Sequence, residues 1–293
     1  MTQAGIEASR IDEDLVRALL REQFPDWAGL AVRAVEPGGN DHRTFRLGDE
    51  LSVRLPSAPG YMPQVAKEQA WLPRLAPAVP LPIPVVRAKG EACDIFPAPW
   101  SVYGWLHGEP LAAASIDDPV RLAVDLAGFL VALRGVDPAG GPRPGLHSAY
   151  RGAPVAHWDD EVRDILNRLD GAERDRAAGT WRDAVVAPDA ESAAWLHGDV
   201  AVSNLLVRDG ALAAVIDFGC SAVGDPACDT VIIWTHFRGA AREAFRREYD
   251  VDEATWARGR GWALWKALIM LTNKPPAQRA LARHVLDELF AGV

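Results

Sequence analysis

Two polar side chains flank a predicted β-hairpin, and their types could hold a metal ion. The hairpin is predicted over residues 204–219, where Asp209-Gly210 is typical of a two-residue turn between apolar strands. Antiparallel strands joined by a tight turn end side by side, so Asn204 and Asp217 should lie at the same end of the ribbon. Their amide and carboxylate oxygens could share a hard cation such as Mg²⁺.

A third polar residue, Asp199, lies one short loop before the hairpin. A carboxylate at that place could accept a hydrogen bond from a substrate hydroxyl and direct its oxygen towards a phosphorus atom. The three residues Asp199, Asn204 and Asp217 therefore predict phosphoryl transfer. In such chemistry the protein mainly positions the reactants and neutralises phosphate charge.

The order and spacing of these residues resemble a known signature. The chain reads H-x-D-x-x-x-x-N over residues 197–204 and Asp-Phe-Gly over 217–219, as protein kinases do. Gly198 stands where protein kinases usually have Arg, and Gly-Asp-Pro-Ala-Cys-Asp follows at 224–229. With these features the chain resembles the aminoglycoside phosphotransferase family, which includes macrolide kinases and other small-molecule kinases.

The resemblance implies an α+β class and a bilobal, protein-kinase-like fold. Residues 1–105 would form a small N-terminal lobe, built on an antiparallel sheet, that binds the nucleotide. Residues 106–293 would form a mainly helical C-terminal lobe for catalysis and acceptor binding.

The resemblance also implies roles for single residues of the second lobe. Asp199 would be the catalytic base or the residue that orients the acceptor hydroxyl. Asn204 and Asp217 would bind Mg²⁺. His197 and Asp229 would be structural residues that brace the catalytic loop.

In the first lobe the resemblance implies a site for ATP or GTP. Arg54 stands where kinases have the Lys of V-A-I-K, and Glu68 is its candidate ion-pair partner. An edge-strand arginine and a solvated helix glutamate are the alternative for this pair, and plain turn chemistry is the alternative for Asn40. The expected nucleotide-binding residues are Arg54, Glu68, Asn40, Tyr103 at the gatekeeper position, and the backbone of Gly104 and Leu106.

The acceptor-binding residues are the weakest part of the prediction. Asp159 and Glu161 could attract a cationic acceptor, but acidic residues at a helix start also complement the helix dipole. Trp234 could stack on an acceptor ring, although core packing is the more common role of a tryptophan.

The patterns along the chain predict the elements that must position these residues. Asp12 could cap a first helix, and residues 30–56 read as a three-stranded meander. A helix at about 64–75 and strands near 85–88 and 100–105 complete the first lobe. The helices predicted for the second lobe begin at Pro119 and then cover about 158–169, 172–185, 226–237, 240–249, 253–272 and 277–291.

Composition excludes several classes of protein. The 293 residues carry a formal net charge of −9, which argues against nucleic-acid binding and suits either a cationic small molecule or simple solubility. No apolar stretch predicts a membrane helix, and no secretory signal is visible. The three cysteines show no metal-binding spacing, so a cytoplasmic protein is expected, with no prediction of oligomeric state.

The expected function is thus Mg²⁺-dependent transfer of the γ-phosphate of ATP or GTP to a hydroxyl of a small molecule. An aminoglycoside-type or related antibiotic is the first candidate, with a role in antibiotic resistance. The alternatives are a kinase for another small metabolite and a catalytically inactive kinase-like binding module. A protein kinase is disfavoured, because only a few residues separate Gly219 from Gly224, which leaves no room for a long activation loop.

Overall fold

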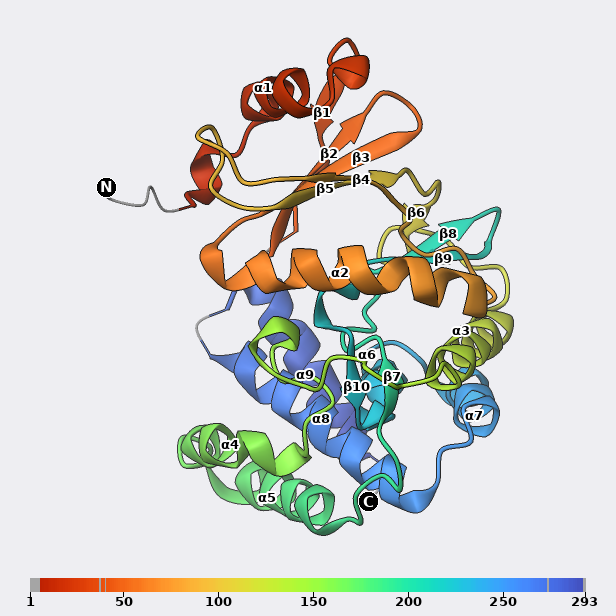
Figure 1. Ribbon diagram of the computed structural model, residues 1–293. Coiled ribbons are helices and arrows are strands. Elements are labelled where there is room, and N and C mark those ends of the chain that lie inside the picture. The colour runs from red at the N-terminus through yellow and green to blue at the C-terminus, as the bar shows by residue number, and fades with distance from the viewer. Residues whose placement is uncertain (1–5, 37, 40, 273, 292–293) are drawn as a thin grey trace.

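The computed structural model describes residues 6–36, 38–39, 41–272 and 274–291, which form two lobes with helix α2 (Met62–Leu75) between them (Figure 1). The predicted α+β, kinase-like architecture is confirmed: a five-stranded sheet forms the first lobe and most helices lie in the second. None of the helices within the described ranges is long and apolar enough to cross a membrane.

The sheet of the N-terminal lobe is antiparallel and has the strand order β1-β2-β3-β5-β4. Buried Val53, Leu55 and Trp100 pack under α1, which Asp12 caps by accepting a hydrogen bond from Leu15 N at 2.9 Å. The elements are α1 (Glu13–Gln23), β1 (Val32–Ala34), β2 (His42–Leu47), β3 (Leu51–Pro56), β4 (Val86–Gly90) and β5 (Trp100–Gly104).

The predicted hairpin is present as β8 (Leu205–Arg208) and β9 (Ala211–Val215). Asp209 and Gly210 at its turn both have positive φ, 53° and 74°, as a tight hairpin turn of this type requires. The sequence patterns did not predict three short strands beside it. These are β6 (Glu109–Pro110), which pairs with β8, and the pair β7 (Ala194–Leu196) and β10 (Ala222–Gly224).

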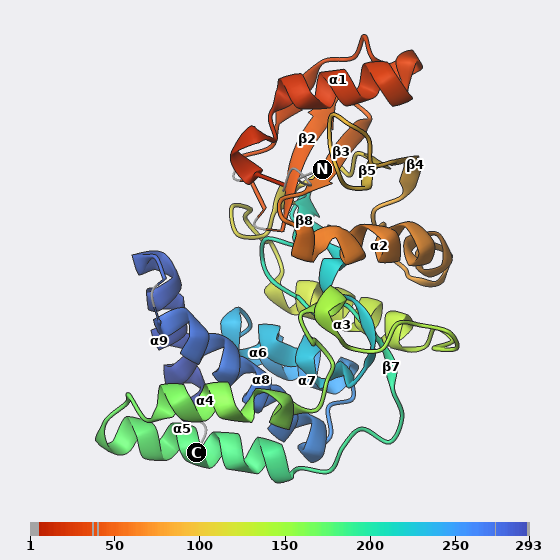
Figure 2. The same ribbon diagram turned by 60° about the vertical axis from the view of Figure 1, so that its left-hand side comes forward.

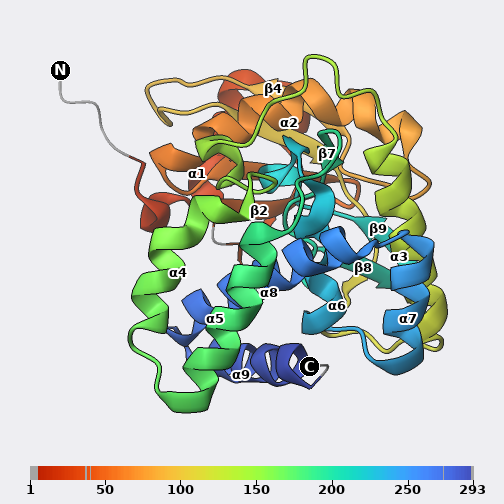
Figure 3. The same cartoon turned by 90° about the horizontal axis from the view of Figure 1, so that it is seen from below.

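The helices of the C-terminal lobe surround one large apolar core. Helix α8 crosses the middle of this lobe, with α4 and α5 on one side and α6 and α7 on the other (Figure 3). Turned by 60°, the molecule shows α4 and α5 on the side of the lobe away from the sheet (Figure 2). The helices are α3 (Pro119–Arg134), α4 (Asp159–Leu166), α5 (Gly171–Val186), α6 (Ile232–Thr235), α7 (Gly239–Glu248), α8 (Glu253–Leu271) and α9 (Pro276–Phe290).

One predicted helix is wrong in its form. The segment 226–237 is a 3₁₀ helix followed by the single turn of α6, and its backbone follows the tertiary contacts of Asp229, which accepts hydrogen bonds from His197 N and Gly198 N. The 3₁₀ helices are Ala8–Arg10, Pro25–Trp27, Pro59–Tyr61, Ala76–Ala78, Leu146–Ser148, Val155–Trp158, Phe218–Cys220 and Pro226–Val231.

A buried ammonium group joins α2 to the C-terminal lobe. Lys67 Nζ donates hydrogen bonds to the carbonyls of Gly219 at 2.6 Å, Ser221 at 2.8 Å and His147 at 3.2 Å. The side chain is buried, and three carbonyl acceptors offset much of the cost of removing its charge from water. The segment that follows Asp217 is thus tied directly to the N-terminal lobe.

We expect Lys67→Met to lower the free energy of unfolding by about 1–3 kcal/mol, because the carbonyls lose their donor while the residue keeps its length. Urea unfolding followed by tryptophan fluorescence measures the change. Lys89→Met, at an exposed position on β4, is the matched control and should have little effect. Equal unfolding midpoints for the two variants would contradict this role of Lys67.

Candidate active site

A cleft of about 600 Å³ lies between the two lobes and contains most of the predicted site residues. Chain segments far apart in the sequence meet there: the end of β5, the loop 197–204 before β8 and the segment after β9. The predicted residues that line the cleft are Arg54, Tyr103, Gly104, Leu106, Asp199, Asn204 and Asp217. Asn40 lies outside the described residues, and its neighbours Asp41 and His42 line the cleft.

The hairpin brings Asn204 and Asp217 together as predicted. Leu205 pairs with Val215, and Ile216 N donates to the Asn204 carbonyl at 2.9 Å, so both residues stand at the same end of the ribbon. Asn204 Nδ2 donates to the backbone carbonyl of Asp199 at 2.9 Å and to Asp199 Oδ2 at 3.3 Å. These bonds orient the amide, and its Oδ1, which accepts a hydrogen bond from Ser203 Oγ at 3.3 Å, keeps a second lone pair for a ligand.

Buried Asp229 holds the loop that carries Asp199. Its two carboxylate oxygens accept hydrogen bonds from His197 N at 2.8 Å and Gly198 N at 2.7 Å. Asp199 N donates to His197 Nδ1 at 3.2 Å, so Nε2 carries the proton that it donates to the Ile216 carbonyl at 3.0 Å. His197 thereby links the loop 197–204 to the segment between β9 and Asp217.

Gly198 is required by the same loop. Its φ is +85°, and a Cβ there would lie 2.3 Å from the carbonyl oxygen of Cys220. Any larger residue at this position would therefore force the two loops apart. The packing explains in physical terms why the arginine of protein kinases is absent here.

The pKa of Asp199 is lowered to about 2. Burial would raise it, but the positive charges of Lys266 and Arg151 outweigh that effect. Lys266 Nζ lies 3.2 Å from Asp199 Oδ1. Asp199 is therefore ionised at neutral pH and is a weak base, which suits orienting a hydroxyl better than removing its proton early.

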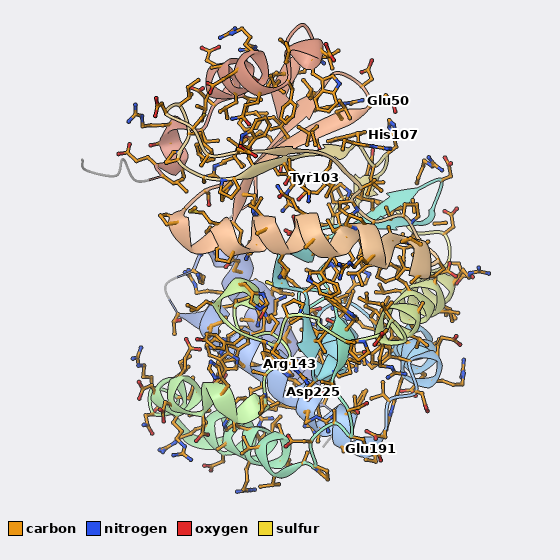
Figure 4. All side chains as sticks on the ribbon, viewed as in Figure 1. Glu50, Tyr103, His107, Arg143, Glu191 and Asp225 are labelled. Carbon is orange, nitrogen blue, oxygen red and sulfur yellow. The ribbon has the colours of Figure 1, made fainter. Side chains whose placement is uncertain are left out.

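Arg54 bridges two carboxylates across the cleft. Its Nη2 lies 3.0 Å from Asp217 Oδ1 and its Nη1 lies 3.5 Å from Glu68 Oε1, so the predicted pair with Glu68 is present. Burial would raise the pKa of Asp217, but the charge and hydrogen bond of Arg54 lower it. Tyr103, which lies between the sheet and α2 in Figure 4, donates its hydroxyl hydrogen to Glu68 Oε2 at 2.6 Å.

The residues around Asp217 fit Mg²⁺ bound together with phosphate groups. Within the described ranges, no three His, Cys, Asp or Glu side chains are grouped to hold a metal by themselves. Mg²⁺ commonly uses only one or two protein ligands and completes its shell with water and substrate phosphates. The Asp217 side chain is 38% exposed and faces the cleft beside Asn204, which meets that requirement.

The residues that were weakly predicted to bind the acceptor do not line the cleft. Trp234 is 2% exposed and packs on Trp256, with ring centroids 4.8 Å apart, so it belongs to the core. Asp159 accepts a hydrogen bond from Trp181 Nε1 at 2.8 Å, and Glu161 accepts one from Trp265 Nε1 at 2.7 Å. Both carboxylates lie in the first turn of α4 and hold tryptophans.

Sequence patterns missed several charged or polar groups near the site. Lys67 and Gln64 come from α2, where Gln64 Nε2 donates to Asp41 Oδ2 at 3.0 Å. His42 is buried beside the cleft, and burial lowers its pKa to about 3, so its ring is neutral. Arg151 and Lys266 approach Asp199 from distant segments, and no local motif marks them.

Comparison with known proteins identifies the family to which this chain is similar. Residues 32–262, which make up more than half of the chain, match the model of APH, the phosphotransferase enzyme family. No curated protein matches the chain.

Solved structures share the fold. Wild-type aminoglycoside 2'-phosphotransferase-IIIa in its GDP complex has a TM-score of 0.76 at 20% identity, covering 96% of this chain and 99% of that one. Macrolide 2'-phosphotransferase MphH from Brachybacterium faecium has a TM-score of 0.65 at 22% identity, covering 94% and 98%. A thermostable mutant of aminoglycoside phosphotransferase APH(4)-Ia, with AMP-PNP and hygromycin B, has 0.64 at 18%, covering 94% and 97%. Identities of this size show the fold.

We expect Gly198→Ala to destabilise the protein and to reduce activity strongly, because its Cβ would meet the Cys220 carbonyl. Gly239→Ala is the matched control: Gly239 also has positive φ, +48°, but has no atom within 4 Å of a built Cβ. The free energy of unfolding of this control should fall by about 1–2 kcal/mol, from backbone strain alone. Urea unfolding compares the two, and an equal loss would mean that the loops tolerate the extra carbon.

Proposed function

This chain belongs to the phosphotransferase enzyme family and is a small-molecule kinase, and we propose that it transfers the γ-phosphate of ATP or GTP to an acceptor hydroxyl in a Mg²⁺-dependent reaction. We further propose residues 1–105 and 106–293 as the limits of its lobes, and the cytoplasm as its location. The observation that carries the proposal is the meeting of Asp199, Asn204 and Asp217 at one interlobe cleft.

In this proposal the residues of the C-terminal lobe position the reacting groups. Asp199 is ionised and accepts a hydrogen bond from the acceptor hydroxyl, which aligns that oxygen with the γ-phosphorus. Asn204 and Asp217 would hold Mg²⁺, which when bound neutralises phosphate charge. His197 and Asp229 keep the loop in place and do not touch the reacting atoms.

The N-terminal lobe would bind the nucleotide. Arg54 holds Asp217 in place and adds positive charge to the phosphate end of the cleft, and Glu68 fixes the other half of its fork. The N–H of Gly104 already donates to the Val85 carbonyl at 2.9 Å. Within the described chain Leu106 N has no protein acceptor, which favours Leu106 as the backbone donor to the base.

The acceptor remains the open part of the proposal. The sequence suggested an aminoglycoside-type antibiotic and hence antibiotic resistance, and the names of the structural neighbours support an acceptor with a hydroxyl group. Those neighbours share only the fold, so a hydroxyl on another small metabolite is an equal candidate. An inactive binding module is disfavoured, because Asp199, Asn204 and Asp217 all line the cleft.

We expect Asp217→Ala to abolish the Mg²⁺ dependence of nucleotide binding, whereas Asp199→Ala should bind Mg²⁺–nucleotide normally and lose roughly 10²–10⁴-fold in turnover. Calorimetry with ATP and with GTP, with and without Mg²⁺, measures binding. A coupled assay of nucleoside diphosphate release against a panel of aminoglycosides, macrolides and hydroxylated metabolites measures turnover.

Asp49→Ala, at an exposed turn, is the control for loss of one carboxylate. Unchanged Mg²⁺–nucleotide affinity in Asp217→Ala would refute the metal role. Near-normal turnover in Asp199→Ala would refute its catalytic role.

We expect Arg54→Lys to weaken Mg²⁺–nucleotide binding by about tenfold, because one ammonium cannot replace a fork that contacts two carboxylates on opposite sides. Arg33→Lys, exposed on β1, is the matched control. The same calorimetric titration measures both variants. Wild-type affinity in Arg54→Lys would show that positive charge alone is sufficient at this position.

A further inference from the structure

Asp199 borders two separate spaces. One is the interlobe cleft, which it shares with Asn204 and Asp217. The other is a small hollow on the C-terminal lobe, lined by Asp199 together with Arg151, Val231, Cys228, Trp262 and Lys266. Neither Arg151 nor Lys266 lines the cleft. If the cleft holds the nucleotide, the hollow is where a group of the acceptor would lie.

Two cations meet in this hollow. Lys266 pairs with Asp199, and the side chain of Lys266 is 23% exposed. Arg151 lies over the ring of Trp265, 4.3 Å from its centroid, and 5.8 Å from that of Trp262. In the described part of the chain no carboxylate forms an ion pair with Arg151, and its buried Nε has no hydrogen-bond partner. The charge of Arg151 acts on Asp199, but the guanidinium makes no ion pair in the described chain, so on its aromatic surface it is suited to bind an anion.

The charges around the hollow oppose a polycationic acceptor. Asp199 supplies one negative charge, and Arg151 and Lys266 supply two positive charges. The acidic residues predicted to attract a cation, Asp159 and Glu161, accept hydrogen bonds from Trp181 and Trp265 and do not line the hollow. An aminoglycoside with several ammonium groups would meet like charge next to the reacting hydroxyl, which disfavours binding.

We propose that the acceptor carries an anionic group, a carboxylate or a phosphate, which Arg151 and Lys266 bind beside the hydroxyl that is phosphorylated. This inference rests on the proposed function of the same site. The hollow measures about 10 Å³, about the space of one water molecule, so a single oxygen of the anionic group would enter it and the rest of that group would lie at its mouth. The rest of the acceptor extends outwards from it.

The proposed step needs no further reactant. The acceptor hydroxyl oxygen forms a bond to the γ-phosphorus while the bond from that phosphorus to the bridging oxygen of the nucleotide breaks. The hydroxyl proton passes late in the step to Asp199 and then to solvent, and the nucleoside diphosphate leaves. The anionic group stays bound to Arg151 and sets the distance of the hydroxyl from Asp199.

Calorimetry with small probes tests the proposal without knowledge of the acceptor. Sulfate stands for a phosphate group, malonate for a carboxylate and kanamycin for a polycation. Each is titrated into the full chain alone, with Mg²⁺–ADP, and with Mg²⁺–AMP-PNP, whose terminal phosphate occupies the γ position. We expect sulfate or malonate to bind in all three states and kanamycin to bind more weakly.

Variants connect the binding to Arg151. Arg151→Gln should weaken binding of the anion about ten- to a hundredfold, and Arg151→Lys should retain part of it. Arg176→Gln is the matched control, since Arg176, on α5, also lies over an aromatic ring, that of Phe290 at 4.8 Å. Thermal melting checks that each variant is folded. If Arg151→Gln does not fold, Arg151→Lys alone tests the role of Arg151.

Four results would overturn the proposal: no binding of sulfate or malonate, wild-type anion binding in the folded Arg151 variants, loss of the anion with Mg²⁺–AMP-PNP, or tighter binding of kanamycin. Loss with Mg²⁺–AMP-PNP would mean that the cations serve the transferred phosphate. Failure of the proposed function would show separately, as absence of Mg²⁺–nucleotide binding in the same titrations, while the probe alone still tests the anion site.

Discussion

The carboxylate of Asp229 is the constraint on which the site depends. It is buried, and burial raises its pKa, yet it accepts the N–H groups of two consecutive residues, His197 and Gly198. Two backbone N–H groups buried without acceptors would lower the free energy of unfolding by several kcal/mol. This carboxylate and the loop conformation therefore stabilise each other. Because Asp199 follows directly, its position is set by a residue that does not itself line the cleft.

The second constraint is the arrangement of charge across the lobes. Arg54 on the sheet contacts Asp217 on the C-terminal lobe, and Lys67 on α2 binds the carbonyls just beyond it. Arg54 is also paired with buried Glu68, and removal of one partner from a buried ion pair typically costs about 3–5 kcal/mol, because the other charge is left unpaired. The same contacts that hold the lobes together therefore also hold Asp217 in its place, so stability and site geometry are coupled.

The sequence predicted those parts of the site that short segments determine. The hairpin, the adjacency of Asn204 and Asp217 and the family all followed from spacing within residues 197–229. The sequence did not predict Lys67, because a lysine in a helix carries no sign of the carbonyls that it will meet from distant loops. It also predicted one continuous helix over 226–237, where the structure has a 3₁₀ helix and one α-helical turn, and where Asp229 bonds to the distant loop at 197–198.

The two sides of Asp199 differ in how they are built, and this difference explains which part of the function the motif could predict. On the side of the cleft, Asn204 lies five residues after Asp199 in the sequence, and one hairpin joins Asn204 to Asp217. The residues proposed for the reaction are therefore recognisable from their spacing in the sequence. On the other side, Arg151 and Lys266 come from a loop before α4 and from the middle of α8. Their meeting depends on packing of tryptophans around α8, and such packing can change without any change in the motif. Reaction type is thus encoded locally, whereas the charge that selects the acceptor is encoded by tertiary structure.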